Sequence, residues 1–140
     1  EQHTTGDSMF RELTPHYMNT VPIKKRSVLL NRFFEPEMSE ILIKIDCQGA
    51  EIPILKGASK FYEKTDFIIL EVPFFGKYNQ GVSSFFDHIK FMDEIGFVVY
   101  ELLDEHDAHG FTVQLDLVFI NKKHRFNQEV QYRLNPSIRR

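Results

Sequence analysis

The sequence has little of several features that define common classes of protein. Its one cysteine, Cys47, excludes an internal disulfide framework and a cysteine-ligated zinc cluster, and it fits a reducing compartment such as the cytoplasm. No apolar run approaches the roughly 20 residues of a transmembrane helix, and the first residues show no signal-peptide pattern. A glycine-rich phosphate loop with its lysine and serine or threonine is also missing, which excludes P-loop nucleotide hydrolysis.

The chain also lacks a large excess of either positive or negative charge. The formal net charge is −3, so no overall field draws the chain toward nucleic acid or an anionic membrane. The basic clusters at residues 122–125 and 139–140 are explained by a solvated strand end and a tail. We therefore predict no nucleic-acid partner and no membrane span.

The chain does have enough apolar material for one folded domain. It contains 140 residues, of which 42% are hydrophobic and 14 are phenylalanine, and this composition favours a single core over disorder. We expect an irregular segment over residues 1–20 with a short helix near 8–13, an α/β domain over 21–124 and a charged tail over 125–140. Because the sequence opens with Glu1, we expect a processed or truncated product.

The centre of the pattern is a strand over residues 40–46 that turns sharply into a helix. Apolar residues alternate up to Asp46, Gly49 gives the backbone freedom for the turn, and Pro53 falls in the first helical turn, where its missing N–H costs nothing. A second apolar strand over 66–72 follows, as in a parallel sheet that helices flank. The predicted fold class is α/β, with a partial doubly wound Rossmann-like sheet.

The remaining elements add an antiparallel edge to this sheet. Ser84 and Asp87 form a capping pattern for a helix that Gly96 ends. Two strands without a helix between them then predict an antiparallel hairpin at one sheet edge. The other expected elements are an edge strand over 20–26, helical turns over 27–34, an aromatic loop over 74–81, strands over 97–103 and 114–121, and a polar loop over 104–110.

Acidic residues mark the candidate site. Asp46 and Glu71 both follow apolar strands at their carboxyl ends, where open α/β sheets bind ligands. Asp46 is either a ligand-facing acid or general base, or an aspartate that caps the turn. Glu71 ends a buried strand and is expected to line a pocket. Glu51, one helical turn inside the helix, faces either the site or the solvent.

A metal centre is the weakest of the alternatives. Residues 104–109 contain His106 and His109, but the segment has no helical periodicity and no third fixed ligand, so a polar hairpin loop explains it better. We therefore predict no metal at the site. Metal-assisted hydrolysis ranks last among the functions considered, and its ligands would be Asp46, Glu71 and either His106 or His109.

With these residues placed, the chain resembles the FkbM family of S-adenosylmethionine-dependent methyltransferases, specifically the second half of its catalytic domain. The signature that carries the resemblance is LIKIDCQGAE at residues 42–51, followed by ILKGA at 54–58. Less specific matches are ILE at 69–71, GF at 96–97 and DLVF at 116–119. The resemblance spans the chain from about residue 8 to about residue 123.

The resemblance implies a seven-stranded methyltransferase fold whose final strand is inserted antiparallel. It implies S-adenosylmethionine as the cofactor and an O-methyl transfer to a hydroxyl of a sugar or natural product, so the partner would be a small-molecule or glycan acceptor. On this basis we assign catalytic roles to Asp46 and Glu71, cofactor binding to Asp46 and Gln48, and substrate binding to Glu51 and Tyr78.

The chain departs from the family pattern in three places. Gln48 stands where the family usually has glutamate, and Asn31 stands where an aspartate commonly follows leucine, so each position lacks a negative charge near the expected site. The 140 residues also contain neither the glycine-rich first strand that holds the donor's methionine carboxylate nor the acid on the second strand that holds its ribose.

The third departure leads to an expectation about the edge of the strand over 40–46. An apolar parallel edge without a neighbour promotes aggregation. We therefore expect either upstream sequence in the natural protein, or a cover from the N-terminal segment or another chain, such as a homo-oligomer through this edge. The alternative function is a non-catalytic α/β binding or oligomerisation module that has the fold without the donor site.

Overall fold

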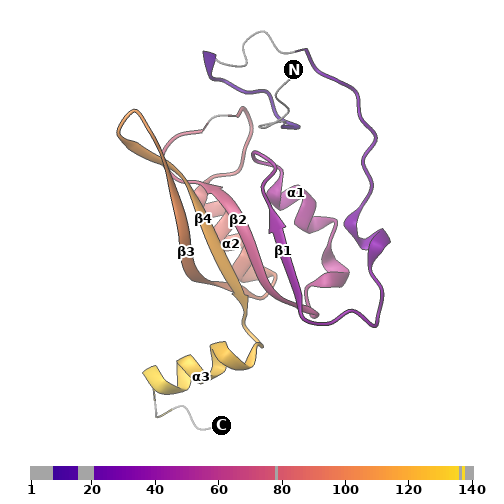
Figure 1. The fold of residues 1–140 in the computed structure, drawn as a ribbon, viewed down its shortest axis with the longest axis vertical. Coiled ribbons are helices and arrows are strands. Elements are labelled where there is room, and N and C mark those ends of the chain that lie inside the picture. The colour runs from indigo at the N-terminus through magenta and orange to yellow at the C-terminus, as the bar shows by residue number, and fades with distance from the viewer. Residues whose placement is uncertain (1–7, 16–20, 78, 136, 138–140) are drawn as a thin grey trace.

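Four strands build one mixed sheet in the computed structural model of the chain, which describes residues 8–15, 21–77, 79–135 and 137 (Figure 1). The elements in chain order are η2 (Leu30–Phe33), β1 (Ile41–Ile45), α1 (Glu51–Lys56), η3 (Ser59–Phe61), β2 (Thr65–Pro73), α2 (Phe85–Glu94), β3 (Phe97–Ala108), β4 (Phe111–Asn121) and α3 (Arg125–Leu134). The strand order is β1-β2-β4-β3, so β1 and β3 form the two edges.

The sheet combines a parallel pair with antiparallel pairs. β1 and β2 are parallel, with Ile45 opposite Leu70, whereas β4 runs antiparallel to β2, with Asp116 opposite Glu71, and antiparallel to β3. The α/β class, the parallel first pair and the antiparallel hairpin at an edge are confirmed. This register places the carboxyl ends of β1 and β2 and the first half of β4 at the same end of the sheet.

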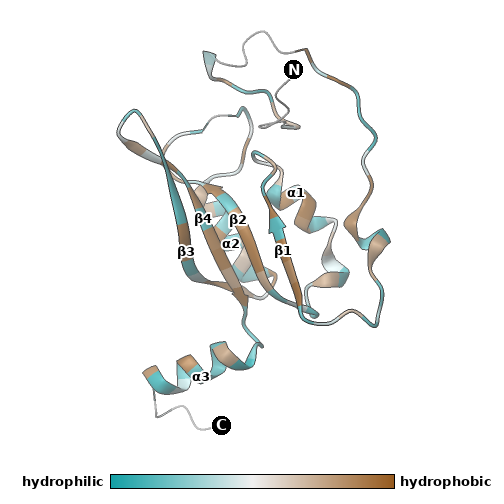
Figure 2. Cartoon of the chain, viewed as in Figure 1, coloured by the Kyte–Doolittle hydropathy of each residue, from teal (hydrophilic) through white to brown (hydrophobic). Residues whose placement is uncertain are grey.

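Both α1 and α2 pack on one face of the sheet. Leu55 of α1 and Met92 of α2 are fully buried and join Leu70 of β2 and Phe119 of β4 in one hydrophobic cluster. Successive residues of a strand point to opposite faces, so Ile69 faces the other side. Figure 2 shows the hydrophobic residues along β1, β2 and β4. The apolar runs that predicted the strands therefore supply the core.

The turn between β1 and α1 requires glycine for two reasons. Gly49 has a φ of 103°, which residues with a side chain rarely adopt, and a Cβ added there would clash with Cγ2 of Val82. Gln48, just before it, also has a positive φ of 49°. The predicted role of Gly49 in the tight turn is thus confirmed.

The ends of the helices follow the predicted signals. Ser84 Oγ accepts a hydrogen bond from the N–H of Asp87 at 3.2 Å, and the carboxylate of Asp87 accepts one from the N–H of Ser84 at 2.8 Å, which is the capping box. Gly57 follows the last residue of α1, and Gly96 follows the last turn of α2 with a φ of 95°. Both glycines therefore stand at helix ends, and the predicted role of Gly96 is confirmed.

The hairpin of β3 and β4 is longer than predicted. We placed a polar loop over residues 104–110, but β3 continues to Ala108 and β4 begins at Phe111. His109 and Gly110 connect the strands with φ values of 54° and 81°, as a two-residue type I′ turn requires. Polar side chains do not prevent pairing here, because most of this part of β3 is exposed.

The segment before β1 has less regular structure than predicted. Residues 8–13 form no helix, and Glu12 instead pairs with Asn79 in a single β-bridge. Residues 21–26 are exposed and form no strand, and Pro22 has no N–H to donate to a neighbour; residue 20 lies outside the described residues. The helical turns predicted over 27–34 are confirmed in part as η2.

The segment after β4, for which we predicted a charged tail, contains α3. The Nδ1 of His124 caps it by accepting a hydrogen bond from the N–H of Phe126 at 3.2 Å, and the ring of Phe126 packs edge-on against Tyr100. Phe126, Val130 and Leu134 recur at helical spacing, but they stand in a charged segment and none of the helix is buried, so the helix was not predicted. Among the described residues, no helix is long and apolar enough to cross a membrane.

The edge of β1 stays open in the described part of the chain. The strand that pairs with β1 there is β2, on one side. Residues 8–15 do not cover the other side, since their β-bridge goes to Asn79. A cover by upstream sequence, by the part of residues 1–20 that lies outside the described residues, or by another chain therefore stays a prediction.

We expect Gly49→Ala to lower the free energy of unfolding by roughly 2–4 kcal/mol, because it adds both an unfavourable positive φ and a clash with Val82. Gly96→Ala is the matched control, since Gly96 also has a positive φ but no heavy atom lies within 4 Å of an added Cβ. This control should cost about 1–2 kcal/mol. Urea unfolding measures both values, and equal losses would show that the contact with Val82 does not constrain the turn.

Candidate functional site

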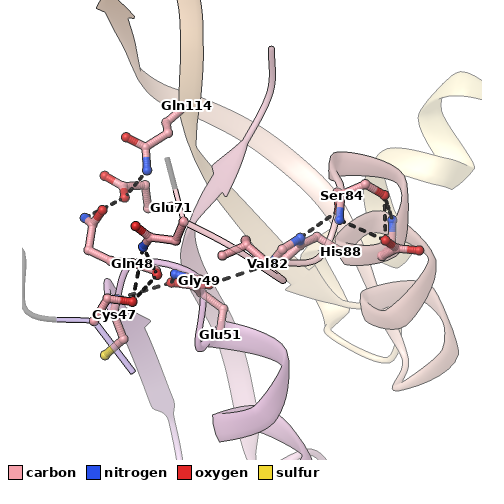
Figure 3. A network of polar contacts seen from close by, with 12 residues as sticks. Cys47, Gln48, Gly49, Glu51, Glu71, Val82, Ser84, His88 and Gln114 are labelled. Atoms are coloured by element: carbon pink, nitrogen blue, oxygen red, sulfur yellow. Dashed lines mark hydrogen bonds and ion pairs between the residues drawn. The ribbon is translucent and has the colours of Figure 1, made fainter. Parts of the chain in front are cut away.

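A buried carboxylate holds the turn at which the candidate site begins. Glu51, the first residue of α1, is 0% exposed, and its Oε1 accepts hydrogen bonds from the backbone N–H groups of Cys47 at 3.2 Å and Gly49 at 3.1 Å (Figure 3). N–H groups before a helix have no partner within the helix, and leaving them unpaired in a buried place is costly. Glu51 therefore fixes the position of Gln48, which lies between the two donors.

His88 of α2 lies against the other oxygen of Glu51. Its Nε2 is 3.7 Å from Oε2 of Glu51, both side chains are fully buried, and neither of these two atoms has a hydrogen-bond partner. Burial acts to raise the pKa of Glu51, but the interactions with His88 and with the backbone N–H groups outweigh burial and leave this pKa below its ordinary value. An ionised carboxylate therefore links the turn to α2.

Three polar side chains from different elements meet beyond the turn. The Oε1 of Glu71, near the end of β2, accepts hydrogen bonds from the amide groups of Gln48 at 2.9 Å and Gln114 at 2.6 Å (Figure 3). The amide of Gln48 also lies 3.5 Å from Asp46, which is paired with Lys44 at 3.2 Å. Gln48 therefore connects the two acids that the strand ends predicted.

His106 of β3 and Asp116 of β4 extend this cluster. The Nε2 of His106 lies 4.0 Å from Oε2 of Glu71 and 3.5 Å from Oδ1 of Asp116. Burial raises the pKa of Glu71, and the charge of Asp46 raises it further, while His106 opposes the shift. The cluster therefore concentrates negative charge at the carboxyl ends of the parallel strands.

A cavity of about 130 Å³ opens beside Glu71. Its walls come from the turn after β1, the end of β2, the loop that follows and the start of β4, and they include Gln48, Gly49, Glu71, Phe75, Asn79 and Gln114. Pockets for small molecules usually measure about 300–1,000 Å³. The cavity therefore has room for one group of a ligand.

Side-chain contacts hold the loop after β2, residues 74–82, beside this cavity. Phe75 stacks on Phe111 with ring centroids 5.6 Å apart, and Lys77 donates a hydrogen bond to the carbonyl of Val82 at 2.8 Å. Asn79 is 4% exposed and donates to the carbonyl of Gln48 at 2.6 Å, whereas its Oδ1 has no partner. The wall of the cavity thus contains a buried acceptor without a donor.

The structure brings Asp46, Gln48 and Glu71 together, as the predicted site requires. Glu51 lies beneath the turn and is not among the residues that line the cavity, so substrate binding by Glu51 stays a prediction. Tyr78, the other predicted substrate contact, lies outside the described residues. The placement therefore supports a site built from the ends of β1 and β2.

Sequence reasoning missed Gln114, Asp116 and Asn79 as members of the site. Gln114 and Asp116 are the polar members of an alternating pattern in β4, on a face that becomes apolar at Val118, and this change along one face is the signal that could have identified them. Their position opposite the end of β2 depends on a register that the sequence does not contain. His106 joins the site because β3 is longer than predicted.

Asn31, which stands where an aspartate was expected from the resemblance, does not belong to this acidic cluster. Its side chain donates a hydrogen bond to Oγ of Ser59 at 3.0 Å and accepts one from the N–H of Lys60 at 2.8 Å, so it connects η2 to η3. These contacts are at the opposite end of α1 from Glu51. We expected a missing charge near the site at Asn31, and the structure shows that this expectation was wrong.

We expect the stability gained from Glu51 to depend on pH. Because its pKa is lower in the folded chain, its charge stabilises the fold above the unfolded pKa of about 4.3, and this contribution is lost as the pH falls through the lower folded value. At pH 7, Glu51→Gln should lose roughly 1.5–3 kcal/mol relative to the wild type. Urea unfolding between about pH 3 and pH 7 should show the difference shrinking in acid.

The matched control for this series is Glu94→Gln. Glu94 forms an exposed pair with Lys90 at 3.8 Å, so its replacement should change stability by less than about 0.5 kcal/mol at any pH in the series. A loss in Glu51→Gln that stays constant with pH would contradict an ionised Glu51 in the folded chain.

A protein-family match covers the elements that build most of this site. The family described as the methyltransferase FkbM domain matches residues 2–99, a range that includes β1, α1, β2 and α2. Comparisons with curated proteins and with solved structures gave no match. The matched range covers more than half of the chain and contains the turn at Gly49 together with Asp46, Gln48 and Glu71. The resemblance seen in the sequence is thus confirmed, and the chain belongs to the FkbM methyltransferase family.

Proposed function

We propose that the chain takes part in methyl transfer from S-adenosylmethionine to a hydroxyl group of a sugar or natural product. The observation that supports this most is the meeting of Asp46, Gln48 and Glu71 at the carboxyl ends of β1 and β2, within the range that matches the methyltransferase domain. Ligands of open α/β sheets bind at these ends. The acceptor would be a small molecule or a glycan.

The charge of the site fits the proposed cofactor, which when bound supplies an electrophilic methyl group on a positively charged sulfur. Asp46, Glu71 and Asp116 place three carboxyl groups in one cluster, and a site of this sign favours a cationic ligand. Asp46 and Gln48 would hold the cofactor. The unpaired Oδ1 of Asn79 offers an acceptor for a ligand hydroxyl or amine.

The residues of the chain would orient the acceptor hydroxyl and receive its proton. The side chain of Asp46 is 45% exposed, so it can reach a ligand that lies beyond the strand ends. Glu71 uses Oε1 for two glutamine amides and leaves Oε2 for a substrate hydroxyl. Glu51 would act on the substrate through the turn that it holds, and Tyr78 is the remaining candidate contact. Methyl transfer gains most of its rate from such positioning.

We further propose that the sheet is part of a doubly wound methyltransferase sheet. β4 lies antiparallel between β2 and β3, which is the insertion of the final strand that membership of the family implies. α1 and α2 occupy one face, and the open edge of β1 is where further parallel strands would pair. A homo-oligomer through the same edge is the alternative cover.

One observation favours a second candidate, a non-catalytic binding or oligomerisation module. The cavity of about 130 Å³ is smaller than most small-molecule pockets, which measure about 300–1,000 Å³. In a module of this kind the acidic cluster would contribute to the fold or to a partner surface. Binding of the cofactor product distinguishes the two candidates.

The first test is calorimetric titration of S-adenosylhomocysteine into the 140-residue chain and into the protein as the cell makes it. We expect saturable binding with a dissociation constant in the micromolar range by at least the latter, because the family fold is built to hold this ligand. Binding by neither protein would favour the non-catalytic module.

The second test concerns Asp46. We expect Asp46→Asn to lower the rate of methyl transfer by well over tenfold, as the loss of a positioned acid or base typically does, with little change in unfolding. Asp93→Asn is the control, since Asp93 is an exposed acid paired with Lys122 near the other end of the sheet. Radiolabelled methyl transfer measures both, and equal rates for wild type and Asp46→Asn would remove Asp46 from the mechanism.

A further inference from the structure

We propose that Glu71, His106 and Asp116 form a binding site for one divalent transition-metal cation. The three residues come from β2, β3 and β4, and one ligand atom of each lies within 4.8 Å of the others. The strands, and not a loop, therefore hold the three ligands. The site goes beyond methyl transfer, and it shares Glu71 with the proposed catalytic residues.

The distances are close to those of a coordinated ion. Metal–nitrogen and metal–oxygen bonds of about 2.0–2.2 Å place neighbouring ligands about 3.0–3.5 Å apart. His106 Nε2 is already 3.5 Å from Asp116 Oδ1, and it is 4.0 Å from Glu71 Oε2. Small side-chain rotations would therefore complete the coordination.

One of the three ligand atoms lacks a hydrogen bond, and one of the carboxylates is held by outer hydrogen bonds. The Nε2 of His106 is buried and has no hydrogen-bond partner. The side chain of Glu71 is 10% exposed, and its Oε1 accepts from both Gln48 and Gln114, which orients Oε2 toward His106. Carboxylates that bind metals are typically held by such outer hydrogen bonds.

A protonated imidazole between two carboxylates is the competing explanation for this cluster. Such an imidazolium would donate short hydrogen bonds, usually about 2.7–2.9 Å long. The separations of 3.5 and 4.0 Å leave room between the groups instead. An atom bonded to all three would fill that room and pair the orphan nitrogen of His106.

The ligand set indicates the class of metal. One imidazole nitrogen with two carboxylate oxygens suits Zn²⁺, Co²⁺ or Mn²⁺ better than Mg²⁺, which prefers oxygen ligands alone. The carboxylate of Asp46, linked to Glu71 through Gln48, adds negative charge nearby. A cation here would lie at the wall of the cavity, because Glu71 and Gln114 line it.

The site has a consequence for the roles of the acids. A cation bound to Oε2 of Glu71 would occupy the oxygen that otherwise faces a substrate hydroxyl. Asp46 would then remain as the acid that receives a proton. The bound cation would also polarise an oxygen atom of a ligand in the cavity, as a Lewis acid does.

The test is titration of Zn²⁺ alone into the metal-free chain, followed by calorimetry, with thermal unfolding and Co²⁺ absorption as independent measurements. We expect one Zn²⁺ per chain, a rise in the unfolding temperature, and visible Co²⁺ bands that Zn²⁺ removes. Mg²⁺ should bind at least tenfold more weakly than Zn²⁺. None of these measurements requires methyl transfer, so failure of the proposed activity would leave them interpretable.

The variants His106→Ala and Asp116→Asn should each weaken Zn²⁺ binding at least tenfold and abolish the Co²⁺ bands. His109→Asn is the control, because it removes the neighbouring imidazole while asparagine tolerates the positive φ of the turn. Circular dichroism checks that each variant folds, and Asp116→Asn keeps the test open if His106→Ala does not. Absence of Zn²⁺ and Co²⁺ binding by the folded wild type, or binding that only His109→Asn removes, would overturn the proposal.

Discussion

The contacts of the buried Glu51 carboxylate are the interactions that connect β1, α1 and α2. One of its oxygens pairs the N–H groups of Cys47 and Gly49, and the other lies against His88 in the core. A charge taken out of water is costly unless its partners are in place, so the contacts of Glu51 favour the docking of β1, α1 and α2 together. The same bonds position Gln48, and through it the acidic cluster.

This arrangement separates the stabilising charge from the chemically available ones. Glu51 is fully buried beneath the turn, whereas Asp46, Glu71 and Asp116 lie on the side of the sheet away from α1 and α2. Burial raises the pKa of Glu71, and repulsion from the carboxyl groups of Asp46 and Asp116 raises it further. A cationic ligand relieves this repulsion, and both a sulfonium and a metal ion would do so. The fold therefore builds a site whose preference is for positive charge.

The sequence predicted the parts of this site that depend on local chemistry. The acid after β1, the glycine of the turn and the capping box of α2 are visible in neighbouring residues. Gln114, Asp116 and His106 reach the site through the pairing of β4 with β2 and β3, and such register depends on contacts distant in the chain. α3 was not predicted, although Phe126, Val130 and Leu134 recur at helical spacing, because these apolar residues are few, lie in a charged segment and are not buried. The length of β3 was missed for a related reason, since an exposed strand needs no alternation.

The departure at Gln48 fits this electrostatic arrangement. A glutamate there would add another carboxylate within reach of Oε1 of Glu71, where an amide now donates a hydrogen bond at 2.9 Å. The repulsion would favour a protonated Glu71, and a proton on Oε1 would compete with the amide of Gln114 for that oxygen. Glutamine instead satisfies Oε1 without charge and leaves Oε2 directed toward His106 and Asp116. The glutamine at position 48 therefore leaves Glu71 able to serve as a ligand of the proposed cation site.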